Sequence, residues 1–97
     1  TSFAKYLVQG RDAEKVLGQI CANNVAVDPG TSVYTQWLNE RGGIEADLTV
    51  TRLAEDRYLI VTAAASQTRD LDWLVRHIPS DAHAIATACL PSQPVTA

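Results

Sequence analysis

The sequence has no apolar run near the roughly 20 residues that a membrane-spanning helix needs. It also has no basic cluster, because eight scattered lysines and arginines stand against eleven acidic residues, for a net charge of −3. We therefore expect neither a membrane nor a nucleic acid as partner. Only two cysteines are present, Cys21 and Cys89, and they form no CxxC pair. We expect free thiols in a reducing compartment: the cytoplasm, or the mitochondrial matrix in a eukaryote.

The sequence lacks the residue patterns that are typical of several kinds of functional site. Gly42 and Gly43 form only a pair, and no strand-to-helix junction follows them, which argues against a phosphate-binding glycine loop. His77 and His83 have no second ligand at metal spacing. No Ser-His or Cys-His pair can be argued from spacing. We expect no metal site and no nucleophilic dyad.

The composition is that of a globular domain, with 46% apolar and 20% charged residues in a chain of 97. This length suits one domain, which we place at residues 1–89. Residues 90–97 contain two prolines and no periodic pattern, so we expect a flexible tail.

Periodicity predicts five strands and two helices. The strands are expected at residues 2–9, 32–38, 44–52 and 58–62 and, weakly, at 82–89. One helix follows Asp12, a good N-cap, with a buried stripe of Ala13, Val16, Leu17, Ile20 and Cys21. The second helix ends before Pro79, with a stripe of Leu71, Leu74, Val75 and Ile78, which leaves Trp73 at its edge.

The order β-α-β-β-β-α-β predicts an α+β fold. We expect an antiparallel or mixed sheet of about five strands with two helices on one face. Omitting one strand leaves the ferredoxin-like split βαβ pattern.

The strand expected at 44–52 carries an unusual pair of acidic residues. Strict alternation places one face of it at Ile44, Ala46, Leu48 and Val50, and the other at Glu45, Asp47, Thr49 and Thr51. Carboxylates are depleted in strand interiors, yet two share the polar face here. That face is either solvated surface or the wall of a polar site.

The run VYTQWLNERGGIEADLTVTRL at residues 33–53 resembles the folate-binding aminomethyltransferase domain of the glycine cleavage system T-protein family. The ending TVTRL and the early SFAKY resemble most the C-terminal module of flavin enzymes of the dimethylglycine and sarcosine dehydrogenase type. The likeness runs from about Ser2 to about Thr87, with Ala63 where the T-protein branch has an asparagine.

The resemblance implies a catalytic and cofactor-binding role for Asp47. The matching carboxylate faces tetrahydrofolate, orients the nitrogen that attacks a methylene iminium, and helps remove its proton. Tyr34 matches the family's tyrosine and is expected to line the pterin pocket. A solvated carboxylate is ionised at neutral pH and can accept a hydrogen bond from an amine. Whether Tyr34 and Asp47 share a sheet face depends on the strand register.

The family's domain is several times longer than this chain. We therefore expect a truncated module, its first subdomain, which has one wall of the folate pocket, no flavin site and no turnover alone. The alternative is a non-catalytic module that forms a homodimer through an exposed sheet edge or apolar surface. A regulatory ligand-binding domain is a third reading, resting on fold analogy only.

Overall fold

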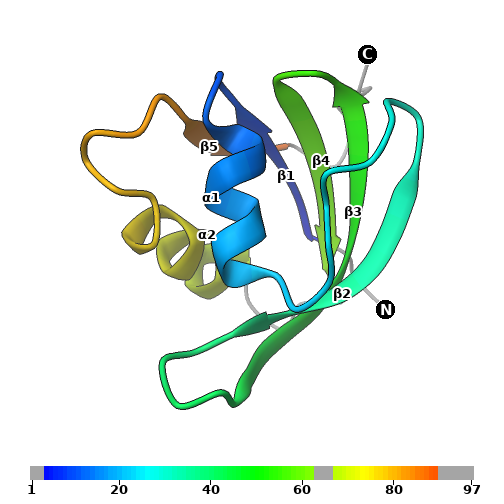
Figure 1. Cartoon of the computed structure of the whole chain (residues 1–97). Helices are drawn as coiled ribbons and strands as arrows, with labels where there is room; N and C mark the ends of the chain where they lie inside the picture. The colour runs from blue at the N-terminus through cyan, green and yellow to red at the C-terminus, as the bar shows by residue number, and fades with distance from the viewer. Residues whose placement is uncertain (1–3, 63–66, 90–97) are drawn as a thin grey trace.

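The computed structural model describes residues 4–62 and 67–89, so the tail expected at 90–97 lies outside the described residues. Its elements, shown in Figure 1, are β1 (Ala4–Gln9), α1 (Ala13–Ile20), β2 (Ser32–Leu38), β3 (Ile44–Ala54), β4 (Arg57–Thr62), α2 (Gln67–Arg76) and β5 (Ile85–Ala88). No helix in the described part is both long and apolar enough to span a membrane.

The five strands form one sheet in the order β2-β3-β4-β1-β5, and every pair of neighbours is antiparallel. Strands β2, β3 and β4 form an antiparallel meander. Strand β1 then lies between β4 and β5, so α2 connects two strands that are not neighbours. Without β2 the order is the split βαβ arrangement. The α+β prediction is confirmed, and of its two sheet types the antiparallel one is correct.

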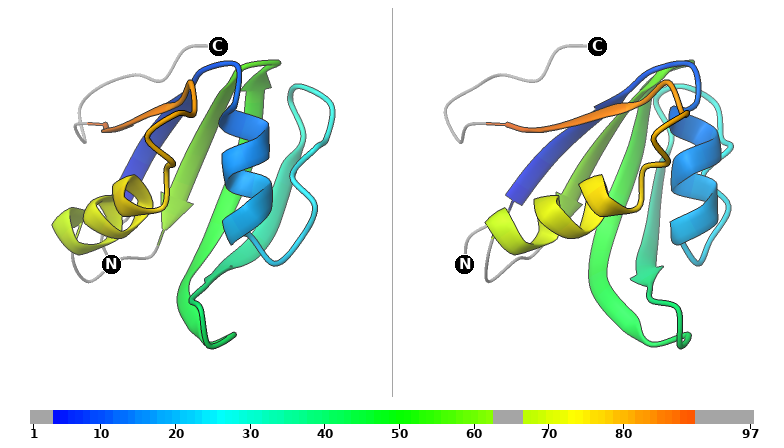
Figure 2. Two further views of the ribbon diagram at one scale, coloured as in Figure 1. Left: turned by 60° about the vertical axis from the view of Figure 1, so that its left-hand side comes forward. Right: turned by 90° about the vertical axis from the view of Figure 1, so that its left-hand side faces the viewer.

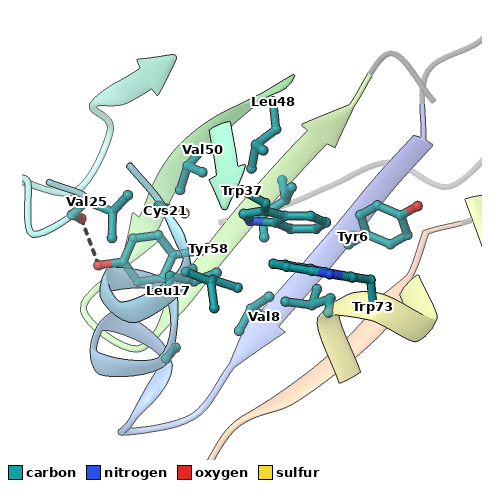
Figure 3. Packing of buried hydrophobic residues seen from close by; sticks show 14 of the residues in the cluster. Tyr6, Val8, Leu17, Cys21, Val25, Trp37, Leu48, Val50, Tyr58 and Trp73 are labelled. Atoms are coloured by element: carbon teal, nitrogen blue, oxygen red, sulfur yellow. Dashed lines mark hydrogen bonds between the residues drawn. The ribbon is translucent and has the colours of Figure 1, made fainter. Parts of the chain in front are cut away.

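Both helices lie on the same face of the sheet (Figure 2). One cluster of buried side chains joins α1, α2 and four strands, as Figure 3 shows. Its largest fully buried members are Trp37, Tyr6, Tyr58, Leu17, Leu48, Ile60 and Leu74. The predicted face of α1 is confirmed, since all its members are buried. Cys21 belongs to this cluster, and burial raises the pKa of its thiol to about 12, so the thiol is inert at neutral pH.

Asp12 occupies the N-cap position of α1, as predicted, and its carbonyl accepts a hydrogen bond from the N–H of Val16, but its side chain does not cap the helix. Its side chain makes no hydrogen bond to the first turn of the helix. Instead, its Oδ2 accepts a hydrogen bond of 2.7 Å from the backbone N–H of His83, and its own N–H donates to the carbonyl of His83. The bond from His83 lowers the pKa of the Asp12 carboxyl. Asp12 thus ties the start of α1 to the segment that leads into β5.

The buried face of α2 also differs from the predicted stripe. Val75 is 49% exposed, whereas Trp73 is only 8% exposed. The indole of Trp73 stacks on that of Trp37, with ring centroids 5.1 Å apart. Burying a large aromatic ring against another contributes more than burying a valine, so the helix presents Trp73 to the sheet.

Candidate functional site

The register between β2 and β3 shifts once, near the hairpin end. Trp37 lies opposite Ala46, but the next pair is Leu38 with Ile44, so Glu45 is an extra residue on β3. An extra residue of this kind is a β-bulge, which reverses the alternation of the strand beyond it. The period-2 pattern of β3 therefore holds from Ala46 onward and fails before it.

The bulge separates the two carboxylates that alternation placed together. The amide Nδ2 of Asn39 donates a hydrogen bond of 3.2 Å to Glu45 Oε1. Glu45 lines a cavity on the helix side of the sheet, together with Trp37 and Trp73. Asp47 is exposed and pairs with Gln36 on the outer face. The predictions that Glu45 shares the face of Asp47, and that Ile44 shares the face of Ala46, are wrong.

Asn39 holds the turn that connects the two strands. Its Oδ1 accepts hydrogen bonds of 2.9 Å from the backbone N–H groups of Arg41 and Gly43. Gly42 has φ +78°, a conformation that a residue without a Cβ adopts at little cost. Arg41, Gly42 and Gly43 thus shape the turn.

Tyr34 and Asp47 lie on the same outer face. Tyr34 is directly opposite Thr49, and Gln36 is directly opposite Asp47. Residues opposite each other in an antiparallel pair project to the same side, so Tyr34 and Asp47 are diagonal neighbours, with a typical Cα separation of about 7–8 Å. The Tyr34 side chain is 63% exposed. The structure thereby answers the question of register that the sequence left open.

The other face of the same ribbon is part of the core. Thr35, Trp37, Leu48 and Val50 are at most 2% exposed. Thr35 also bonds to Asn23, which donates its backbone N–H to Thr35 Oγ1 at 2.9 Å. The ribbon that carries Tyr34 and Asp47 is therefore held from behind by packed side chains.

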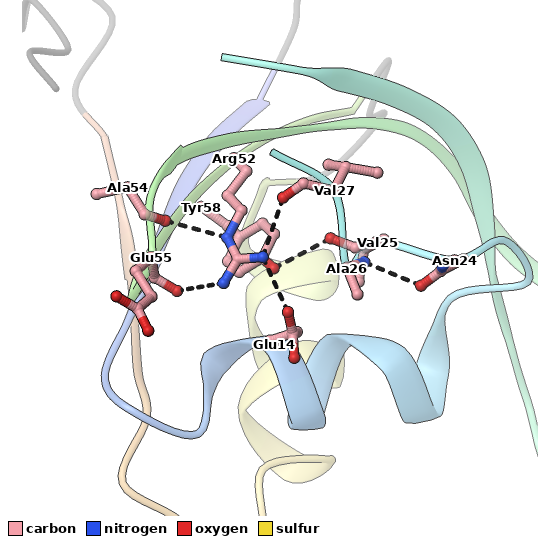
Figure 4. A network of polar contacts seen from close by, with 9 residues as sticks. All are labelled: Glu14, Asn24, Val25, Ala26, Val27, Arg52, Ala54, Glu55 and Tyr58. Carbon is pink, nitrogen blue, oxygen red and sulfur yellow. Dashed lines mark hydrogen bonds and ion pairs between the residues drawn. The ribbon is translucent and has the colours of Figure 1, made fainter. Parts of the chain in front are cut away.

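Arg52, near the end of β3, fixes the segment that leads from α1 into β2 (Figure 4). Its Nη1 donates to Glu14 Oε1 at 2.8 Å and to the carbonyl of Val27 at 3.0 Å. Its Nη2 donates to the carbonyl of Glu55, and its guanidinium lies 5.2 Å from the ring centroid of Tyr58. Sequence reasoning missed this role, because its partners come from three separate segments.

The cavity on the helix side has a volume of about 440 Å³. One wall is a stack of three rings, in which Trp73 contacts both Trp37 and His77, the latter with centroids 4.0 Å apart. The Nδ1 of His77 lies 2.7 Å from the carbonyl oxygen of Trp73, which positions the ring at the helix end. Tyr34 and Asp47 are not among the lining residues, so this cavity is separate from their face.

The outer face suits hydrogen bonding rather than metal binding. It offers one carboxylate, one phenol and neutral polar groups on a rigid ribbon. In the described part of the chain, no three His, Cys, Asp or Glu side chains cluster as metal ligands would. A carboxylate beside an aromatic ring can hold a planar ligand by its amine.

Comparison with known proteins shows what the chain is similar to. Residues 1–92 match the family model described as the GCVT N-terminal domain. Over 74 residues the chain is 42% identical to a 4-methylaminobutanoate oxidase (formaldehyde-forming) of Paenarthrobacter nicotinovorans, covering 76% of this chain and 9% of the relative. It is 40% identical to an aminomethyltransferase of Phocaeicola vulgatus, covering 75% of this chain and 20% of the relative.

A solved structure has the same fold. The glycine cleavage system aminomethyltransferase T from Bartonella henselae superposes with a TM-score of 0.82 at 30% sequence identity. The superposition covers 90% of this chain and 24% of that protein. The chain therefore spans a quarter or less of the length of each of these three proteins.

Proposed function

Because this chain belongs to the family of GCVT N-terminal domains, we propose that the outer face of its β2–β3 ribbon is one wall of a folate site used in aminomethyl transfer. The observation that carries the proposal is the placement of Tyr34 and Asp47 as diagonal neighbours on one exposed face. Tetrahydrofolate would bind there as the acceptor of a one-carbon unit.

Asp47 has the chemistry that such an acceptor needs. Its carboxylate accepts a hydrogen bond from an amine N–H and so directs the nitrogen lone pair toward an electrophilic carbon. As the nitrogen forms its bond to the one-carbon unit it must lose a proton, which Asp47 can accept and pass to water. Tyr34 offers a ring edge and face against which a pterin can lie. Asp47 is thus proposed as catalytic and ligand-binding, and Tyr34 as ligand-binding.

The 97-residue chain alone is expected to bind folate weakly and to have no turnover. Binding pockets usually bury 70–90% of a ligand's surface between several elements. The described residues offer an open sheet face at Tyr34 and Asp47, with no described element across from it. We expect a dissociation constant in the millimolar range, about 4 kcal/mol of binding free energy.

The parent protein would be an enzyme of the flavin branch. There, a separate flavin domain would oxidise an N-methyl amine, and this module would transfer the resulting one-carbon unit to tetrahydrofolate. Support comes from a relative whose name describes an oxidase of a methylamino compound that forms formaldehyde. We propose no flavin site in this chain.

The test is a two-dimensional NMR titration of the chain with 5-formyltetrahydrofolate, a stable reduced folate that keeps one bridge N–H. Backbone signals of Gln36, Asp47 and Thr49 should shift in the wild type and much less in Asp47→Asn. The matched control is Asp72→Asn, an exposed carboxylate on α2, which should titrate as the wild type does. Absence of shifts on the ribbon, or equal shifts in Asp47→Asn, would contradict the proposal.

A second candidate is a homodimer through an edge strand, and the exposed apolar residues favour β5. Ile85 on β5 is 67% exposed, and Val75 on α2 borders the same groove. The β2 edge is less available, because Gln36 accepts a hydrogen bond of 2.9 Å from the N–H of Ala22. Sedimentation velocity should show a dimer that Ile85→Lys dissociates; a monomer at high concentration would rule it out.

A further inference from the structure

The outer face of the ribbon carries a third feature beside Tyr34 and Asp47. Beyond the bulge, Leu38 pairs with Ile44. Leu38 is four residues from Tyr34 on β2, so the two side chains project to the same face of the sheet. Leu38 is 36% exposed and Ile44 is 64% exposed. Together with Tyr34 they make three of the five exposed large apolar side chains found among the described residues. An apolar pair thus follows directly after the Gln36–Asp47 pair.

The bulge at Glu45 creates this arrangement. In a regular strand, Ile44 would project to the same side as Ala46, toward the helices. The extra residue reverses its direction and places it opposite Leu38 on the outer face. The same reversal sends Glu45 to the helix side, where Asn39 holds it. The bulge in the backbone therefore places Leu38 and Ile44 together on the outer face.

The spacing along the ribbon is regular. Positions that share a face are two residues apart, or roughly 6.6 Å along a strand. The distance along the strands from Tyr34, past Asp47, to the Leu38–Ile44 pair is thus about 13 Å, twice that step. The order is an aromatic ring, a carboxylate, and an aliphatic surface. A reduced folate presents a complementary order: a pterin ring, the amine nitrogens, and an aminobenzoyl ring.

We propose that Leu38 and Ile44 form an apolar subsite for the aminobenzoyl ring of a folate whose amine nitrogens lie at Asp47. This inference rests on the proposed function and adds the orientation of the ligand. The pterin lies toward Tyr34, and the benzoyl ring lies over the hairpin end. Burying the flat faces of the benzoyl ring against two aliphatic side chains removes apolar surface of both partners from water.

The direct test is an intermolecular NOE measurement on the 97-residue chain with 5-formyltetrahydrofolate. NOEs are expected from the benzoyl protons to the methyl groups of Leu38 and Ile44. Shifts at Asp47 without these NOEs would overturn the subsite and leave the proposed function standing. Absence of ligand shifts at Asp47 would overturn both. Shifts of Leu38 and Ile44 that depend on protein concentration alone would assign the patch to a second copy of the chain, and would also overturn the subsite.

Substitution gives an independent measurement. Ile44→Thr keeps the β-branch and should weaken folate binding about fivefold, as expected from losing part of an aliphatic contact. The matched control is Ile85→Thr on the far edge strand, where the side chain is 67% exposed. At a concentration where both proteins sediment as monomers, its affinity for folate should equal that of the wild type. Leu38→Thr provides a second variant if Ile44→Thr proves unfolded by circular dichroism. Equal affinities of the wild type, Ile85→Thr and whichever of Ile44→Thr and Leu38→Thr is folded would contradict the subsite.

Discussion

Replacing Gly10 by alanine tests how the turn between β1 and α1 packs against the chain that leads into β5. Gly10 has φ +139°, which side chains other than glycine rarely allow. A Cβ at this position would lie 2.0 Å from the carbonyl oxygen of His83 and 2.7 Å from its carbonyl carbon. His83 cannot easily move away, because Asp12 bonds to both its N–H and its carbonyl.

The expected cost of Gly10→Ala follows from two contributions. Holding a residue with a side chain in an unfavourable backbone region costs about 1–3 kcal/mol. Displacing packed backbone to relieve the overlap costs about 1–3 kcal/mol more. A domain of this size has a free energy of unfolding of roughly 5–15 kcal/mol. The variant should therefore lose a large share of its stability, and its melting temperature should fall by about 10 °C or more.

Gly18→Ala is the matched control, because it adds the same methyl group to an open position. Gly18 lies on α1 with nothing within 4 Å of the added Cβ. Alanine favours a helix over glycine by about 1 kcal/mol, so this variant should be more stable than the wild type. Urea denaturation followed by far-UV circular dichroism measures both. A Gly10→Ala protein as stable as the wild type would refute the proposed close contact at His83.

Two further predictions concern polar contacts. Arg52→Met should lower the free energy of unfolding by about 2–4 kcal/mol, since three partly buried acceptors, Glu14 Oε1 and the carbonyls of Val27 and Ala54, lose their donor. Glu14→Gln should cost about 1 kcal/mol or less, because the Glu14 side chain is 46% exposed and an ion pair with a half-solvated carboxylate contributes little; equal losses in urea denaturation would contradict this ranking. For Asp12, the folded-state pKa lies below its ordinary value of 3.8, so its contribution is complete above that pH and is lost as the pH falls through the folded pKa. Melting temperatures from pH 6 to about pH 2.5 should fall more steeply in the wild type than in Asp12→Asn, and parallel curves would contradict the assignment.

The strand pattern could be predicted because alternation reports burial directly. Thr35 and Trp37 share a face of β2 in the sequence pattern and are both fully buried in the structure. The hairpin turn was also predictable, since Gly42 and Gly43 mark a place where the chain reverses. These features depend on residues close together in the sequence, which is why the order of elements and the α+β class follow from it.

The predictions that fail depend on contacts between residues far apart in the sequence, or on an irregularity of the backbone. Alternation assumes two residues per repeat, and a single inserted residue at Glu45 cannot be detected from residue types alone. The buried face of α2 depends on Trp37, which lies far from Trp73 in sequence but stacks on it. Asp12 fits the composition of an N-cap, yet His83 from the other end of the chain competes for its carboxylate.

The candidate site, like the fold, could be predicted from the sequence only in part. The resemblance of the surrounding run points to Tyr34 and Asp47, but their common face follows only from the pairing of Tyr34 with Thr49 and Gln36 with Asp47. No local sequence pattern indicates the structural role of Arg52. Its importance appears only when Glu14, the carbonyl of Val27 and the ring of Tyr58 meet around it in space.

The bulge divides the β2–β3 ribbon into two parts, and separate sets of contacts hold each part in place. The Trp37–Ala46 pair and the packed residues behind it hold the register at Asp47, whereas the turn at Asn39 holds the residues beyond the bulge. A change in the turn should therefore move Ile44 relative to Asp47 without moving Asp47 on the sheet. The carboxylate and the apolar pair are positioned by separate sets of contacts. A ligand that touches both is sensitive to the bulge in a way that a ligand held by Asp47 alone is not.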